Sequence, residues 1–306
     1  MRDLRRKMKG IKSTRQVTKA MELVAASKMR RAVSNAIELR RFALASWHIL
    51  LRVSRRNPMS HPALRKRPVQ KVLAVLYTSD RGLTGAMGTQ ILKATAEYIA
   101  NLKGISSFES IDFIALGRRG QQFLARAGQN VIAAFPAFSN HPKLRDVAPV
   151  AKMVSDAFNA ETYDHVALIY PDFISALSQK PTVKVLLPFT DSELREMVKS
   201  LGINPESVRA ESELKTTDES AQYLFEPSEG EVLSVALSQI TELQVYQALL
   251  EAVASEHSAR MVAMRSATDN ATAILDDLTL TYNQTRQANI TSELAELSAS
   301  KAALES

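Results

Sequence analysis

Two long segments, one near each end of the chain, carry apolar residues at steps of three and four positions. Neither glycine nor proline occurs between Ile11 and Asn57, or from Glu231 to Ser306. These uninterrupted patterns predict long helices, the second up to about 110 Å in length. The first stripe comprises Leu4, Met8, Ile11, Val17, Met21, Val24, Ala32, Ala36, Leu39, Ala43 and Leu50. The second comprises Leu233, Leu237, Ile240, Leu243, Tyr246, Leu250, Val253, Met261, Met264, Ala267, Ala271, Ile274, Leu278 and Tyr282.

The mean step in the second stripe is about 3.5 residues, which is the period of a coiled coil. A helix with this pattern needs a helical partner along its length. Because the middle of the chain returns between the two segments, we predict that the N-terminal and C-terminal helices pair in antiparallel fashion.

Short apolar runs alternate with helical patterns between these helices, after a basic linker that contains three prolines. Strands are predicted over 71–77, 111–116, 131–135, 165–170 and 182–187, and helices over 86–102, 118–127 and 146–160. Weaker patterns indicate a helix over 191–201, a polar loop over 206–220 and a strand over 223–225. The alternation is typical of a Rossmann-like α/β domain with a mainly parallel sheet.

The predicted fold class is therefore α/β with a long coiled coil. Its parts are an N-terminal coiled-coil helix over 1–57, an α/β globular domain over 68–229 and a C-terminal coiled-coil helix over 231–306. The chain has no cysteine, which excludes disulfides and thiolate metal sites and indicates an intracellular protein. No apolar run approaches the roughly 18 residues that a membrane span requires, so we expect a soluble protein that can attach to a membrane complex.

Positive charge is concentrated at the start of the chain. Residues 1–56 hold 16 Lys and Arg against three acidic residues, a net charge of about +13, whereas the whole chain carries +7. The remainder therefore sums to about −6. A solvated helix face explains the basic segment, and so does a surface that attracts an acidic partner. A nucleic-acid-binding coiled coil is a further alternative, although few aromatic residues lie among the basic ones.

A glycine-rich turn from Thr78 to Gly88 (TSDRGLTGAMG) follows the first predicted strand and precedes a helix. Its glycine spacing matches neither the dinucleotide fingerprint nor the Walker loop, so a structural turn is favoured over nucleotide binding. An α/β enzyme that uses this turn stays open as an alternative. The five histidines are scattered, without a second ligand at metal-binding spacing. We expect no metal, no cofactor and no catalytic residues.

Several segments resemble the gamma subunit family of F-type ATP synthases. The two signature stretches are Ser13 to Arg31 (STRQVTKAMELVAASKMRR) and Ala254 to Thr291 (ASEHSARMVAMRSATDNATAILDDLTLTYNQTRQANIT). The glycine-rich turn, Phe173 to Pro188 (FISALSQKPTVKVLLP) and Gln244 to Ala252 (QVYQALLEA) also resemble stretches of that family. The resemblance covers essentially the whole chain.

This resemblance implies a non-catalytic rotor, the central stalk of a proton-translocating ATP synthase. Its coiled coil would lie inside a ring of alpha and beta subunits. Its α/β domain would contact the c-ring and the epsilon subunit, peripherally on the cytoplasmic face of a bacterial cell membrane. Rotation of the c-ring would turn the stalk, and the asymmetric stalk would change the conformation of the catalytic beta subunits.

The resemblance also implies contact residues for the beta subunits. Lys19, Met21 and Arg260 fall where the family's stalk meets an acidic lever, and Arg286, Gln287, Thr291 and Glu293 fall in an upper contact. The chain departs from the family at its tip, Ala295 to Ser306, which carries polar and charged residues where the family is small and apolar. It also lacks the cysteine-bearing insertion of the chloroplast subunit.

Overall fold

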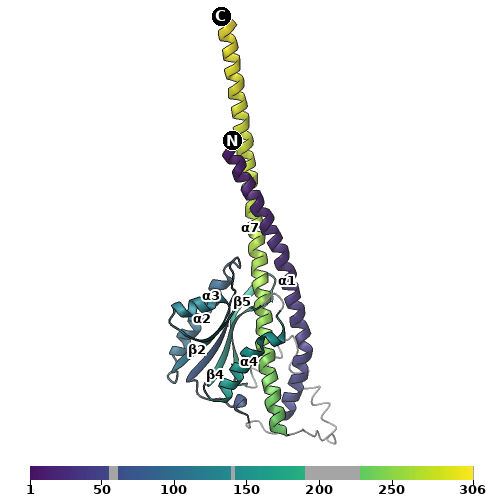
Figure 1. The fold of residues 1–306 in the computed structure, drawn as a ribbon, viewed down its shortest axis with the longest axis vertical. Helices are drawn as coiled ribbons and strands as arrows, with labels where there is room; N and C mark the ends of the chain where they lie inside the picture. The colour runs from purple at the N-terminus through teal and green to yellow at the C-terminus, as the bar shows by residue number, and fades with distance from the viewer. Residues whose placement is uncertain (55–60, 139–141, 190–227, 306) are drawn as a thin grey trace. The chain divides into compact units, whose positions relative to one another are not determined.

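The computed structural model describes residues 1–54, 61–138, 142–189 and 228–305. The chain forms two compact units: unit 1 comprises Met1–Ala26 with Arg260–Ser306, and unit 2 comprises Ser27–Ala259. Helices α1 (Arg2–Ser54) and α7 (Glu229–Glu305) contribute to both units, as the sequence pattern predicts for two long helices (Figure 1). The elements predicted over 191–201, 206–220 and 223–225 lie outside the described residues.

Unit 2 contains a five-stranded sheet of order β3-β2-β1-β4-β5. Its strands are β1 (Lys71–Tyr77), β2 (Ser110–Leu116), β3 (Asn130–Phe135), β4 (His165–Ser175) and β5 (Ser178–Leu187). The first four are parallel and β5 runs antiparallel to β4, so the prediction of a mainly parallel sheet is confirmed.

Strands β4 and β5 extend further than the sequence predicts, because they meet in a tight hairpin. The Ser175 hydroxyl accepts the backbone N–H groups of Leu177 and Ser178 at 3.3 and 3.1 Å, which closes the turn. Pro171 and Pro181 face each other across the hairpin. Both are tolerated because β1 pairs with β4 only as far as Ile169, which leaves this stretch at a sheet edge.

Helices cover both faces of the sheet, so the strands read as continuous apolar runs. On one face Val72, Ala74 and Leu76 pack with α2 (Met87–Lys103) and α3 (Arg118–Arg126). On the other, Leu73 and Val75 pack with α4 (Leu144–Asn159) and with the part of α7 in unit 2 (Figure 1). A short 3-10 helix, η1 (Pro62–Leu64), precedes β1.

In unit 1, α1 and α7 pair in antiparallel fashion. The Arg5 guanidinium donates to the Tyr282 hydroxyl at 2.7 Å and lies over its ring, 5.6 Å from the centroid. The Thr268 hydroxyl donates to the Thr18 hydroxyl at 2.8 Å. Positions later in α1 therefore pair with positions earlier in α7, and the predicted antiparallel coil is confirmed for this unit.

The contact seam follows strict heptad steps of three and four on both helices. The less exposed α1 positions in these steps are Leu4, Met8, Ile11, Arg15, Thr18, Glu22 and Ala25. Those of α7 are Met261, Met264, Thr268, Ala271, Leu275, Leu278 and Tyr282. The prediction that Val17, Val24 and Ile274 belong to the seam is wrong, since these side chains are 55%, 53% and 46% exposed. The neighbouring residues Thr18, Ala25 and Leu275 hold the seam positions instead.

Gly117 after β2 provides a test of the sheet. Its φ is +98°, and a Cβ there would lie 2.0 Å from the Thr78 carbonyl oxygen. We expect Gly117→Ala to lower the free energy of unfolding by about 3 kcal/mol or more in urea denaturation, because strain and overlap combine. Gly128→Ala, with φ +66° but nothing within 4 Å, should cost only about 1–2 kcal/mol. Equal losses would contradict this account.

The register of unit 1 can be tested by cross-linking, since the chain has no cysteine. The double variant Thr18→Cys with Thr268→Cys should form a disulfide under mild oxidation, because the two hydroxyls are in contact. Thr18→Cys with Thr272→Cys, one helical turn away, is the matched control and should stay reduced. Intact-chain mass spectrometry with thiol labelling measures both. Preferential cross-linking of the control pair would overturn the register.

Candidate functional site

The glycine-rich turn after β1 joins the carboxyl ends of three strands. The Asp80 carboxylate accepts the backbone N–H of Arg118 at 2.8 Å and that of Ala137 at 3.2 Å. The Thr78 hydroxyl accepts the N–H of Gly120 at 2.8 Å. The turn thus ties β1 to the start of α3 and to the segment after β3. Because the Asp80 carboxylate already occupies the N-terminus of α3, it would repel a phosphate group at that position.

Two of the turn's glycines lie beneath an arginine side chain. A Cβ on Gly82 would be 3.0 Å from a terminal nitrogen of Arg119, and one on Gly88 would be 3.3 Å from the other. These glycines make room for a guanidinium group. The contacts support the structural interpretation of the turn over the nucleotide-binding one.

Ionisable groups with altered pKa in unit 2 hold α7 against the sheet. The Tyr77 hydroxyl donates to the Val245 carbonyl at 2.9 Å, and burial raises the pKa of Tyr77. The Gln247 amide donates to the Glu251 carboxylate at 2.9 Å. Burial chiefly raises the pKa of Glu251, whereas Gln247, Lys184 and Tyr170 favour its charged form. Within the described residues, no group of three or more His, Asp or Glu is placed to hold a metal ion.

The first group of predicted contact residues lies in unit 1. Lys19 and Met21 are on α1, and the Lys19 ammonium pairs with Glu22 at 3.0 Å. Arg260 is on α7 and is partly buried. Because Thr18 faces Thr268, Arg260 lies about seven residues along the rod from Lys19, or roughly 10 Å. These three residues occupy one region of the rod.

The second group, Arg286, Gln287, Thr291 and Glu293, lies near the C-terminal end of α7, where all four residues are exposed. The Thr291 hydroxyl donates to the Gln287 carbonyl at 2.9 Å, a bond within the helix. Arg286 is 26 residues beyond Arg260, about 39 Å along a helix. The structure therefore places the predicted residues in two separate regions.

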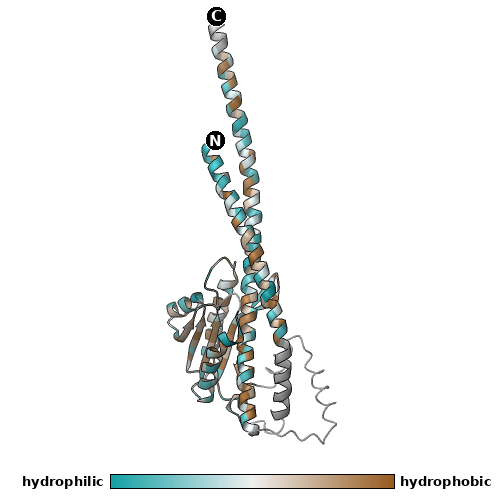
Figure 2. Ribbon diagram, turned by 45° about the vertical axis from the view of Figure 1, so that its right-hand side comes forward, coloured by the Kyte–Doolittle hydropathy of each residue, from teal (hydrophilic) through white to brown (hydrophobic). Residues whose placement is uncertain are grey.

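An exposed apolar stripe on α7 is absent from the sequence prediction. Ile290, Leu294 and Leu297 follow steps of four and three and are all exposed, and Figure 2 shows apolar residues interspersed with polar ones along this part of the helix. The spacing of these three residues is present in the sequence, but the polar and charged residues around them make the pattern hard to recognise. Exposed apolar residues in a row are typical of a protein-binding surface.

A second exposed surface of unit 1 is basic. Arg2, Arg6, Lys7, Lys9 and Lys12 are exposed on the first turns of α1. Among the described residues, Arg6 is the one of these five with an ion pair, to Asp3 at 3.5 Å. Such a cluster attracts an acidic surface. No helix among the described residues is long and apolar enough to cross a membrane.

Comparisons with known proteins agree with these features. Residues 1–304 match the family model described as ATP synthase. An ATP synthase gamma chain of Roseiflexus sp. (strain RS-1) is 38% identical over 306 residues, covering 99% of this chain and 98% of that one. One from Herpetosiphon aurantiacus is 38% identical over 312 residues, with the same coverage of 99% and 98%.

Solved structures show the same architecture. A chain from the central stalk and c-ring of Tetrahymena thermophila mitochondrial ATP synthase is 26% identical, with a TM-score of 0.57, covering 82% of this chain and 99% of that one. A chain from the Euglena gracilis mitochondrial rotor, 19% identical, has a TM-score of 0.59 and covers 94% of this chain and 98% of that one; it supports the fold alone. The predicted fold class is confirmed, and the nucleic-acid alternative finds no support. The chain belongs to the ATP synthase gamma chain family.

Proposed function

We propose that this chain is the central-stalk rotor of a proton-translocating ATP synthase. The observation that carries the proposal is α7 itself, which is packed in the core of unit 2, pairs with α1 in unit 1, and then exposes every side chain from 286 to 300. A helix of this length with an exposed apolar stripe is suited to insertion into an enclosing partner. The gamma chain relatives and the central-stalk structure support the same role.

The chain acts by mechanical coupling and carries no catalytic site. Unit 2 docks on the c-ring and beside the epsilon subunit, and the rod lies inside the ring of alpha and beta subunits. The paired helices present different side chains on each side, so each beta subunit meets a different surface. Rotation changes which beta conformation has the best contacts, and differential contact energy is what shifts a conformational equilibrium.

The two groups of predicted contact residues act at two levels of the rod. Lys19, Met21 and Arg260 meet an acidic segment of the beta subunit, with the basic surface of α1 adding attraction. Arg286, Gln287, Thr291 and Glu293 make the upper contact, where a guanidinium can bind a carboxylate through two hydrogen bonds. The division of the chain into an N-terminal helix over 1–57, an α/β domain over 68–229 and a C-terminal helix over 231–306 remains a prediction.

The subunit acts at the cytoplasmic face of a bacterial cell membrane. It is held there by the c-ring. Bacterial gamma chains are among the relatives, and the described helices include none that could cross a bilayer.

Assembly with the other subunits tests the role. When the chain is co-expressed with the organism's alpha and beta subunits, size-exclusion chromatography should give one large species that contains a single copy of this chain and hydrolyses ATP. Deletion of residues 282–306 should abolish or strongly reduce that activity, because the exposed end of α7 is lost. If the chain elutes alone while the other subunits stay unassembled, the central-stalk role is excluded.

Arg286 tests the upper contact. Arg286→Ala should cost about 1–3 kcal/mol of contact energy, as interface arginines commonly do, and should reduce ATP synthesis several-fold in membrane vesicles. Arg126→Ala, at an exposed arginine on α3, is the matched control and should leave synthesis unchanged. Circular dichroism of both variants checks that the α/β unit stays folded. Unchanged synthesis in Arg286→Ala would refute the assigned contact.

A further inference from the structure

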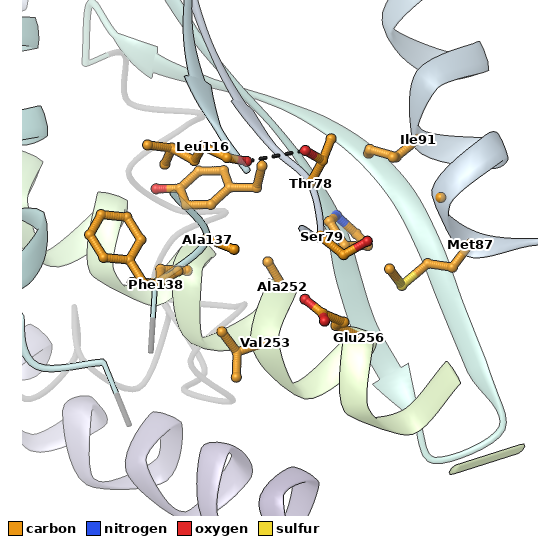
Figure 3. A pocket seen from close by; sticks show the side chains of 14 residues that line it. Thr78, Ser79, Met87, Ile91, Leu116, Ala137, Phe138, Ala252, Val253 and Glu256 are labelled. Carbon is orange, nitrogen blue, oxygen red and sulfur yellow. Dashed lines mark hydrogen bonds between the residues drawn. The ribbon is translucent and has the colours of Figure 1, made fainter. Parts of the chain in front are cut away.

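Helix α7 presents two different faces to the rest of unit 2. Where the helix crosses the end of β1, Ala252 and Val253 line a small pocket with Ser79 and Met87 (Figure 3). The residue before them, Glu251, does not line that pocket. It belongs to a second, polar face, which brings a carboxyl group into the contact between α7 and the sheet.

Glu251 lies in a row of polar side chains that recur at steps of three and four along α7. Such steps place residues on one side of a helix. The other members of the row are all buried: Thr241, Gln244, Gln247, Ser255 and Ser258. At one end of the row, the Ser258 hydroxyl accepts a hydrogen bond from the Gln179 amide of β5 at 3.1 Å. The row therefore reaches the side of the sheet formed by β4 and β5.

Groups from α7, β4 and β5 surround the Glu251 carboxylate, which is half-buried. The Gln247 amide, one helical turn earlier, donates to it at 2.9 Å. Tyr170 and Asp172 interact with it from β4, and Lys184 interacts with it from β5. The carboxylate thus meets one positive and one negative charge in a contact that is largely shielded from water.

Two further titratable groups lie behind these neighbours. Lys180 of β5 is opposite Asp172 in the hairpin, and it is exposed, so solvent screens its charge. Tyr77 of β1 packs edge-on against Tyr170, with 6.3 Å between the ring centroids. Neither group removes the negative charge of Asp172 from the surroundings of Glu251.

These surroundings decide which form of the carboxyl group is favoured. Burial raises the pKa of Glu251 most and Asp172 raises it further, whereas Gln247, Lys184 and Tyr170 offset part of the rise. The unfolded chain has no such surroundings, so the carboxyl group there keeps its ordinary pKa. The folded chain therefore binds a proton more readily, and its stability falls as the pH rises from the ordinary value through the raised one.

We propose that Glu251 is a proton-responsive contact between α7 and the β4–β5 side of the sheet. When the carboxyl group is protonated, α7 packs firmly at this point. When it ionises, a half-buried negative charge beside Asp172 weakens the contact and that stretch of α7 opens more often. The contact lies within unit 2, so it does not depend on the proposed role of the chain as a rotor.

Hydrogen exchange of α7 in the full chain tests the proposal. Peptides that cover residues 245–255 are followed by mass spectrometry from about pH 5 to about pH 8, with rates corrected for the intrinsic pH dependence of amide exchange. Protection in the unaltered chain should fall as the pH rises, by about threefold for each half unit by which the pKa of Glu251 is raised. In Glu251→Gln the fall should disappear, because an amide does not titrate. Glu109→Gln, at an exposed carboxylate of unit 2, is the matched control and should keep the fall.

Asp172→Asn gives a second test, which leaves Glu251 in place. Without the like charge, ionisation of Glu251 is less unfavourable, so the fall in protection should be smaller than in the unaltered chain. If Glu251→Gln lowers the yield of folded chain, this comparison decides. Constant protection in the unaltered chain, an equal fall in Glu251→Gln or Asp172→Asn, or loss of the fall in Glu109→Gln would overturn the proposal.

Discussion

Helix α7 must pack against two different partners along one uninterrupted backbone, and the rest of the structure depends on that constraint. Between Ala236 and Ala259 most of its side chains are buried, as expected for a helix enclosed by other elements. From Arg260 to Thr285 the shielded side chains are those of the seam toward α1 and some beside it, and from 286 to 300 every side chain is exposed. Without glycine or proline after Gly230, the helix has no breaker at either transition.

The seam of unit 1 joins the helices through polar as well as apolar residues. Arg15, Thr18, Glu22 and Thr268 occupy heptad positions that a more stable coiled coil would fill with leucine or isoleucine. Polar seam residues fix register at the expense of stability. The bond between Thr18 and Thr268 shows how: it forms only when these two positions face each other. In a rotor, a fixed register and stiffness of the helix pair matter more than its intrinsic stability, because other subunits enclose it.

Sequence reasoning predicted the α/β domain well because its strands are buried on both faces. The run KVLAVLY shows this, since alternate residues from Val72 to Tyr77 enter two different cores and all six are buried. It failed at Val17, Val24 and Ile274, because a stripe chosen by hydrophobicity alone prefers a large apolar residue to the smaller, polar or equally apolar neighbour (Thr18, Ala25 or Leu275) that the heptad steps place in the seam. The lengths of β4 and β5 were underestimated, because the pairing of Pro171 with Pro181 at a sheet edge depends on tertiary structure and cannot be seen in the sequence pattern. The contact residues came from family resemblance, and exposed side chains carry no physical signal that separates a contact from a solvated surface.

Rotation of unit 2 in the assembled enzyme would test the central claim most directly. A bead attached through an engineered cysteine at the exposed Ser106 can be watched while the alpha and beta subunits are fixed to a surface and supplied with ATP. We expect stepwise rotation in one direction that stops when ATP is removed. A complex that hydrolyses ATP while the bead stays still would contradict the role of this chain as a rotor.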